Sequence, residues 1–182
     1  MFYETYGEFE VPRELVKGKK ALNLSKEALS NFWKMVNQKR SGLSEACGCY
    51  IFAIKAGQGR TPWYVGQSKG PFKDECFAFH KREVYRMVTD RMQGTPVMIL
   101  VARVTPKGKL SKTLKVREAD FVEQLLISHA LSKNSDLSNT KNTAFIKKLR
   151  IPGVLNSLQK RPKKETRILR SVLGIKSSQQ KG

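Results

Sequence analysis

The sequence predicts a protein of the α+β class, in which a β-hairpin and a further strand alternate along the chain with amphipathic helices. The stretch from Gly48 to Lys69 has the composition of a hairpin. Apolar residues recur at helical spacing over residues 25–37, 73–92 and 116–131. At 182 residues, the chain is long enough for one domain with its own core and an extension.

The first 47 residues are expected to pack on the main domain as an arm and a helix. Residues 1–24 mix aromatic side chains with Pro12 and Gly18, which predicts an irregular arm, with room for one short strand. Ser25 is a suitable N-cap, and the following apolar residues favour a helix to Asn37 that covers the core.

The hairpin places one tyrosine on each of its arms. Residues 49–55, which include Tyr50, and residues 61–67, which include Tyr64, are rich in β-branched and aromatic residues. The five residues between them contain two glycines, which supply the positive φ angles that hairpin turns need. Local propensity and turn chemistry therefore agree on this element.

Residues 73–92 predict one long helix with cationic residues near its apolar stripe. On a helical projection, Lys73 and His80 lie along one line beside that stripe, and Lys81 lies on its shoulder. His80 has two interpretations: a histidine held in the core, or a functional residue that shares its line with Lys73.

A third strand, 97–104, and a second long helix, 116–131, complete the domain. In that helix Glu123 falls inside the arc expected to be buried, which is formed by Ala119, Val122, Leu125, Leu126 and Ala130. A buried carboxylate is costly unless it is paired or binds a cation. Glu123 is thus either a functional carboxylate or a boundary residue whose carboxylate reaches a lysine in solvent.

The C-terminal part of the chain is strongly basic. The net charge is +20, and after residue 140 there are twelve basic residues and one acidic residue. Such a charge favours salt-dependent binding to nucleic acid phosphates over contact with acidic lipid, because no aromatic anchor accompanies it. We expect a helix over 164–173, disorder beyond Gly174, and nucleic acid contacts from Lys160, Arg161, Lys163, Lys164, Arg167 and Arg170.

The remaining composition argues against other classes of protein. Three cysteines without a second pair indicate reduced, structural thiols rather than a zinc site. The acidic, aromatic N-terminus does not resemble a signal peptide, and the longest apolar run, 97–102, is far below the ~20 residues of a membrane span. The expected location is the cytoplasm.

Taken together, these residue types suit the hydrolysis of a phosphodiester bond. A hard cation held by a carboxylate can polarise the phosphorus and stabilise a leaving oxygen. A tyrosine near a lysine and a metal ion can act as a base toward water, and lysine or histidine can stabilise the growing phosphoryl charge.

Gly48-Cys49-Tyr50 and Tyr64-Val65-Gly66, separated by a hairpin, resemble the two signature tripeptides of the GIY-YIG nuclease superfamily. The resemblance covers about residues 48–142 and includes Glu123 before Leu126-Ile127. It implies a small, about three-stranded antiparallel sheet flanked by helices. It also implies an endonuclease with Tyr50 as general base or water-positioning group, Tyr64 bonded to the scissile phosphate or to Tyr50, Glu123 on a single Mg²⁺ or Mn²⁺, and Asn139, rather than Asn142, supporting the site.

One feature departs from the family pattern. The family usually has a helix arginine about ten residues after the second motif's tyrosine, and Asp74 and Glu75 stand there instead. Lys73, His80 and Lys81 are the candidate replacements. The chain is then either a variant endonuclease acting on DNA rather than RNA, or a catalytically degenerate module that binds nucleic acid without cutting; a basic protein that associates with RNA is a third, weaker interpretation. The corresponding domains are 1–47, 48–150 and a partly disordered extension over 151–182.

Overall fold

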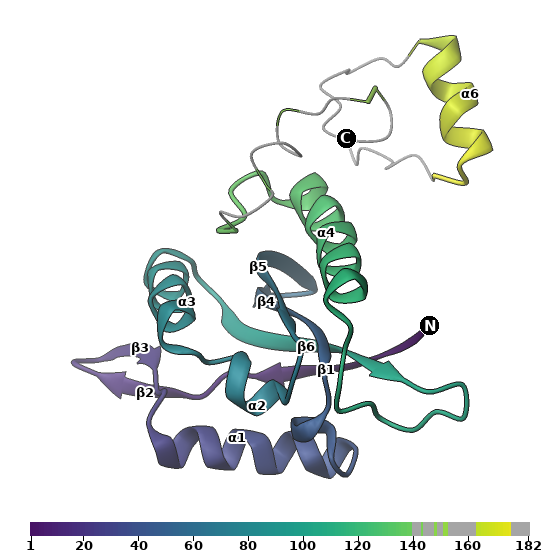
Figure 1. The fold of residues 1–182 in the computed structure, drawn as a ribbon. Coiled ribbons are helices and arrows are strands. Elements are labelled where there is room, and N and C mark those ends of the chain that lie inside the picture. The colour runs from purple at the N-terminus through teal and green to yellow at the C-terminus, as the bar shows by residue number, and fades with distance from the viewer. Residues whose placement is uncertain (140–142, 144–147, 149–150, 153–162, 176–182) are drawn as a thin grey trace. The chain divides into compact units, whose positions relative to one another are not determined.

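The computed structural model describes residues 1–139, 143, 148, 151–152 and 163–175, and its centre is a four-stranded antiparallel sheet (Figure 1). The strands lie in the order β1-β6-β4-β5, with bounds Phe2–Glu10 (β1), Thr95–Val104 (β6), Gly48–Ala56 (β4) and Gly59–Ser68 (β5). The α+β class is confirmed, and the sheet has one strand more than the three expected.

The predicted hairpin is confirmed as β4 and β5. Gly57 in its turn has a φ of 55°, the positive value that the turn requires. The ladder pairs Tyr50 with Gly66 and Phe52 with Tyr64. Beyond this point the register shifts so that Ala53 pairs with Pro62, which makes Trp63 the extra residue of a β-bulge.

The prediction of an irregular N-terminal arm is wrong. β1 pairs with β6 from Phe2 opposite Val104 to Glu10 opposite Val97, and β2 (Arg13–Val16) and β3 (Lys19–Leu22) form a separate hairpin. The pattern of β1 is hard to see in the sequence because its register shifts between Tyr6 and Phe9, so that the alternation of side chains is interrupted.

The first helix is confirmed, with α1 spanning Lys26–Lys39. The Ser25 hydroxyl oxygen accepts a hydrogen bond of 3.2 Å from the Ala28 backbone N–H, which satisfies one of the free donors at the helix start. Phe32 and Val36 are buried. The short 3-10 helix η1 (Leu43–Glu45) then leads into β4.

The single helix predicted over 73–92 is two helices. α2 spans Phe72–Glu75 and α3 spans Phe79–Arg91, and the residues between them break the helical repeat. The break changes the helical phase, so His80 is exposed and Lys81, with 3% of its surface exposed, is buried instead. The predicted alignment of Lys73 with His80 is therefore wrong.

α4 (Val116–Lys133) packs on β4 and β5 and buries a face slightly different from the predicted one. Its buried residues are Ala119, Ile127, Ala130 and Leu131, whereas Leu125 is 48% exposed. Glu123 is half-buried at the margin of this face, not fully inside the buried arc that the helical spacing predicts.

The two faces of the sheet carry separate apolar clusters. The larger cluster joins Tyr50 and Phe52 of β4 with Phe32 of α1, Phe77 of the segment between α2 and α3, and Tyr85 of α3. The ring of Tyr85 stacks on Phe52 at 4.2 Å between centroids. The smaller cluster lies on the α4 face and contains Cys47, Leu114 and Ala119. Tyr50 thus belongs to the main core of the protein.

By its contacts the chain divides into Met1–Asn139 and Thr140–Gly182. The second unit contains α6 (Lys164–Val172), which confirms the helix predicted there. The sequence also predicts a short helix over residues 143–149; this segment, and the region beyond Gly174 where disorder is expected, fall largely outside the described residues. Among the described helices, none has the length and apolar character that a membrane crossing requires.

Candidate active site

The first motif tyrosine and the second motif glycine fit together across the hairpin. Tyr50 lies directly opposite Gly66, and a Cβ atom at position 66 would overlap the Cζ and hydroxyl oxygen of Tyr50. The glycine of Tyr64-Val65-Gly66 is needed because the ring of Tyr50 lies across it. The two motifs are therefore linked by packing as well as by strand pairing.

Tyr50 is completely buried. Its hydroxyl group has no hydrogen-bond partner within the described part of the chain, and burial raises its pKa well above the usual value for tyrosine. The hydroxyl of the neighbouring Tyr85 donates 2.9 Å to the carbonyl oxygen of Cys76. Among the described residues, Tyr50 therefore carries a buried hydroxyl that makes no hydrogen bond of normal geometry, although it interacts with the hydroxyl of Tyr85. Such a buried polar group is costly.

Lys81 is the cation that reaches Tyr50. Its Nζ lies 5.1 Å from the centroid of the Tyr50 ring, close enough for a cation–π interaction. The same ammonium group forms an ion pair with the carboxylate of Glu75 and donates 2.9 Å to the backbone oxygen of Glu75. Glu75, one of the two acids at the expected arginine position, thus holds a buried lysine beside the first tyrosine.

Tyr64 lies next to this group, with its ring centroid 6.4 Å from that of Tyr50. It is half-buried, and burial, then the charges of Glu123 and Glu75, raise its pKa to about 12. Tyr64 is thus protonated at neutral pH and available as a hydrogen-bond donor.

Glu123 is held in place from β5. The side-chain amide of Gln67 donates 3.1 Å to Glu123 and 2.8 Å to Asp120, one helical turn away on α4. Burial raises the pKa of Glu123; the Gln67 hydrogen bond acts against this, Asp120 adds to it, and the positive charges of Lys81 and Lys69 act against it. Excess negative charge thus gathers where α4 crosses β5.

Lys73 and His80 have other surroundings. Lys73 forms an ion pair of 2.6 Å with Glu45 of η1, a hydrogen bond that raises its pKa, and its side chain is 43% exposed. His80 is exposed in the first turn of α3. Of the three candidate cations, Lys81 is the one that the structure brings to the tyrosines.

Asn139 supports the hairpin by pairing with its outer edge. Its Oδ1 accepts 2.9 Å from the Val65 N–H, and its Nδ2 donates 2.6 Å to the Val65 carbonyl oxygen. Ser138 continues the pattern through a backbone bond of 2.8 Å to the carbonyl oxygen of Trp63. The segment after α4 therefore satisfies the polar groups of an edge strand, as an adjacent strand would.

The donor set suits a hard cation with few protein ligands. In the part of the chain that the structure describes, no group of three or more His, Cys, Asp or Glu side chains could hold a metal ion. Glu123 and Asp120 offer oxygen donors on one helix face; burial is the main cause of the raised Glu123 pKa, and the charge of Asp120 adds to it, so a divalent cation would offset both effects.

Gln67 and Asp120 were missed in the sequence, although the spacing contains a signal for both. Side chains alternate along a strand, so Gln67 points away from Gly66 and toward α4. Asp120 precedes Glu123 by three residues, which places both on one helix face. Gln67 Oε1 is buried and has no partner among the described residues.

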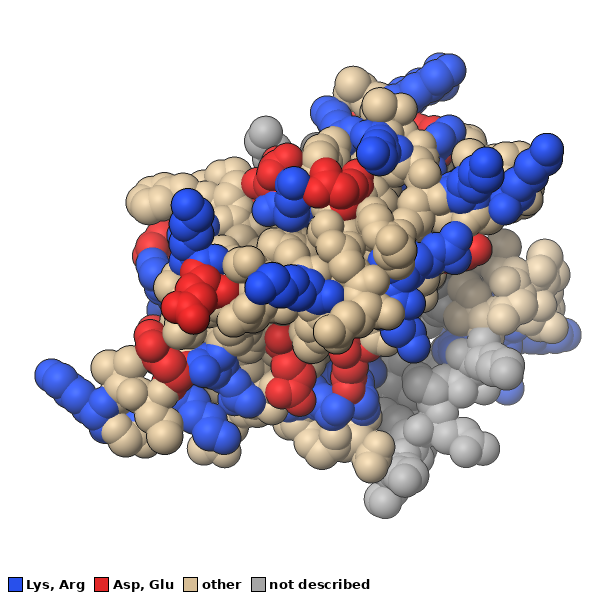
Figure 2. Space-filling view, turned by 90° about the horizontal axis from the view of Figure 1, so that it is seen from below, with Lys and Arg blue, Asp and Glu red and all other residues tan. Residues whose placement is uncertain are grey.

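The expected nucleic acid contacts are described in part. Lys163, Lys164 and Arg167 are exposed at α6 and Arg170 is partly exposed, whereas Lys160 and Arg161 lie outside the described residues. The face that carries α1 mixes basic and acidic side chains without a patch of one sign (Figure 2).

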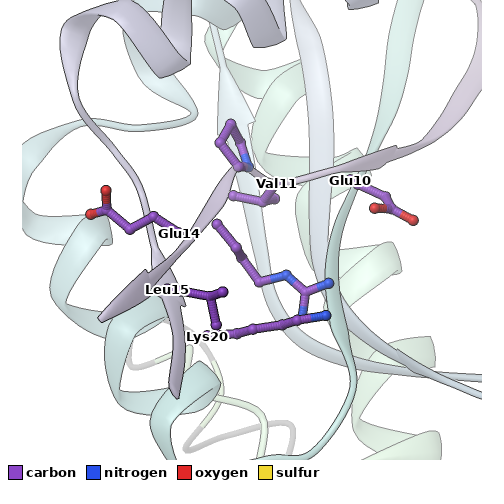
Figure 3. Close-up of a pocket in the computed structure, with 7 residues that line it drawn as sticks. Glu10, Val11, Glu14, Leu15 and Lys20 are labelled. Carbon is purple, nitrogen blue, oxygen red and sulfur yellow. The ribbon is translucent and has the colours of Figure 1, made fainter. Parts of the chain in front are cut away.

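A hollow of about 430 Å³ lies at the junction of β1 with the β2–β3 hairpin, away from the motif residues (Figure 3). Leu15 and Lys20 are ladder partners in its wall, and the carboxylates of Glu10 and Glu14 point away from its centre. Arg13 is occupied by hydrogen bonds to Gly94 and Thr95. None of the sequence-predicted site residues lines this hollow.

Comparison of this chain with models of protein families, with curated proteins and with solved structures gives no significant match.

Proposed function

We propose that the protein is a metal-dependent endonuclease that hydrolyses phosphodiester bonds in nucleic acid, in DNA rather than RNA. The observation that carries the proposal is the electrostatic coupling of three side chains from different elements, Tyr64 of β5, Lys81 of α3 and Glu123 of α4: the charge of Glu123 raises the pKa of Tyr64, and the charge of Lys81 lowers that of Glu123. A proton donor, a cation and a carboxylate are the groups that phosphoryl transfer uses.

The order of elements supports the same proposal. The hairpin β4–β5, then α3, β6 and α4, has the order of the GIY-YIG domain that the two tripeptides resemble (Figure 1). Strand β1 pairs with the edge of β6 that faces away from β4, so it does not come between the hairpin and α4.

Each residue has a defined role in this mechanism. Glu123, with Asp120, would hold Mg²⁺ or Mn²⁺, which supplies polarisation of the phosphorus and stabilisation of the leaving oxygen. Tyr64, protonated because its pKa is about 12, donates a hydrogen bond to a phosphoryl oxygen. Lys81 is too buried to touch the substrate and acts through its field, which the low-dielectric interior screens little.

Tyr50 fits the water-positioning or supporting role better than that of general base. Burial raises its pKa, so the phenol is protonated unless a cation acts on it, and Lys81 lies over its ring face. We assign Tyr50 to the positioning of Lys81 and Tyr64.

The burial of Tyr50 also favours a second candidate function, a degenerate module that binds nucleic acid without cutting it. In this case the Lys81–Glu75 pair is a structural substitute for the missing arginine. The two functions differ in their need for a divalent ion at Glu123.

The test is the nicking of supercoiled DNA with Mg²⁺ or Mn²⁺, run beside an RNA of the same sequence. Glu123→Gln should abolish cutting while salt-dependent binding is retained, and Glu83→Gln, an exposed carboxylate of α3 paired with Arg86, should cut normally. Cutting that survives Glu123→Gln would contradict the site. Binding without cutting, together with no Mn²⁺ site by titration, would establish the degenerate module.

A further inference from the structure

A second hollow, of about 380 Å³, lies between α3 and the segment that follows α4, and it is lined by Trp63, the neighbour of Tyr64 in β5. We call it the methionine groove; its lining residues are Trp63, Met87, Val88, Arg91, Met92, Asp136 and Ser138. It contains none of the residues assigned above to the metal or to phosphoryl transfer.

The groove exists because of the β-bulge. Trp63 is the extra residue opposite the Phe52–Ala53 step, and it packs on the same apolar cluster as Tyr64. The Ser138 backbone N–H donates a hydrogen bond to the carbonyl oxygen of Trp63. Bulges redirect side chains next to functional sites. This bulge brings the indole of Trp63 to the groove, and the next residue in the chain is Tyr64, the proposed hydrogen-bond donor to a phosphoryl oxygen.

The lining is apolar, polarisable and open. Met87 within α3 is 50% exposed and Met92, the residue after this helix, is 38% exposed, although α3 has a buried face. Methionine side chains are flexible and adapt to flat surfaces. The Trp63 indole N–H beneath them has no acceptor among the described residues, so an acceptor that reached it would offset a desolvation cost.

One charge of each sign completes the groove. Arg91, at the end of α3, and Asp136 both line it and are exposed. A nucleotide has matching parts: a flat ring with N–H groups and acceptors for the apolar lining and Asp136, and a phosphate for Arg91. An apolar peptide would leave both charges unused, and the net charge of +20 favours a polyanion.

We propose that the methionine groove binds an unstacked nucleobase of the strand whose phosphate lies at Tyr64, so that the substrate is single-stranded or has a base turned out of its stack. This rests on the proposed function, because the ligand is a nucleic acid. Stacking of a base on an aromatic side chain such as Trp63 tolerates any base sequence, because every base has a π-face.

Trp63 provides a direct probe. The chain has two tryptophans, so Trp33→Phe leaves Trp63 as the single tryptophan, and tryptophan emission then reports on Trp63 alone. Without divalent metal, a short single-stranded thymidine oligonucleotide should change the Trp63 emission saturably, and an abasic strand of equal length should not. In this background Met87→Ala and Arg91→Ala should each weaken binding by about fivefold or more. Met35→Ala, at a methionine of α1 that is 37% exposed and lies outside the groove, should leave the binding unchanged.

The proposal is overturned if fluorescence anisotropy shows the oligonucleotide to bind while the Trp63 emission stays constant, or if the abasic strand gives the same change. The outcomes also separate the two proposals. A base-dependent change in a protein that never cuts DNA contradicts only the proposed endonuclease. Cutting that is unaffected by Met87→Ala and Arg91→Ala contradicts only the methionine groove.

Discussion

Gly66 lies opposite Tyr50 in the β4–β5 ladder and provides the space that the Tyr50 ring fills. Gly66→Ala should therefore destabilise the protein by about 2–3 kcal/mol, because the new methyl group must displace a buried ring. Chemical denaturation measures this change. Gly70→Ala is the control: no atom lies within 4 Å of the added Cβ, so its stability should match the wild type.

Tyr50→Phe removes a buried hydroxyl group that has no partner among the described residues. The variant should be as stable as the wild type or more stable, because an uncompensated desolvation cost disappears. Tyr85→Phe, which loses the bond to the Cys76 oxygen, should cost about 1–2 kcal/mol. A large loss of stability in Tyr50→Phe would show that its hydroxyl group has a partner.

Lys81→Met should reduce cleavage by about tenfold or more, because the cation nearest the tyrosines is lost while the apolar stem is kept. The rate of single-turnover cleavage measures this. Lys73→Met breaks an exposed ion pair with Glu45 and should cut at the normal rate. Equal loss in both variants would assign the effect to net charge rather than to Lys81.

The raised pKa of Glu123 predicts the pH dependence of stability. Because the folded carboxyl group binds its proton more tightly than the unfolded one, ionisation above its ordinary pKa of 4.5 lowers the stability of the wild type. Glu123→Gln should therefore gain stability relative to wild type as pH rises through and above that value, and the difference should vanish in acid. Denaturation curves across this range would contradict the assignment if the difference had the opposite sign. Mn²⁺ should reduce the difference in stability between Glu123→Gln and the wild type, because it binds and stabilises the wild type alone.

Asn139→Ala should destabilise the protein by about 1–3 kcal/mol, because the buried N–H and carbonyl oxygen of Val65 lose their partners. Hydrogen exchange at the Val65 amide should accelerate with it. Ser138→Ala keeps its backbone bond to Trp63 and should protect β5 normally. Unchanged exchange in Asn139→Ala would contradict the role given to Asn139.

The sequence was sufficient for elements whose signals are local. The hairpin has its turn glycines, α1 has Ser25 as N-cap, and Glu123 lies at the helical spacing that half-buries it. The register of the two motif tyrosines does not follow from the turn alone, because the β-bulge at Trp63 shifts it.

Features that depend on a phase or on a distant partner could not be predicted. The break between α2 and α3 changes the helical phase of the residues that follow, so that Lys81 is buried in place of His80. No proline or glycine in the sequence indicates this break. β1 is stable as a strand because β6, more than 90 residues later, supplies its hydrogen bonds. The two hydrogen bonds from Gln67 to Asp120 and Glu123 likewise depend on the packing of α4 on β5.

The pairing of β1 with β6 also limits how the protein can be divided. A fragment that began at Gly48 would retain both signature tripeptides and Glu123, but β6 would expose a row of backbone donors and acceptors along a new edge. Such a fragment would tend to associate through that edge. The segment that precedes the motifs thus protects the edge of β6 against self-association. We expect its removal to lower solubility even where the residues of the candidate site are unchanged.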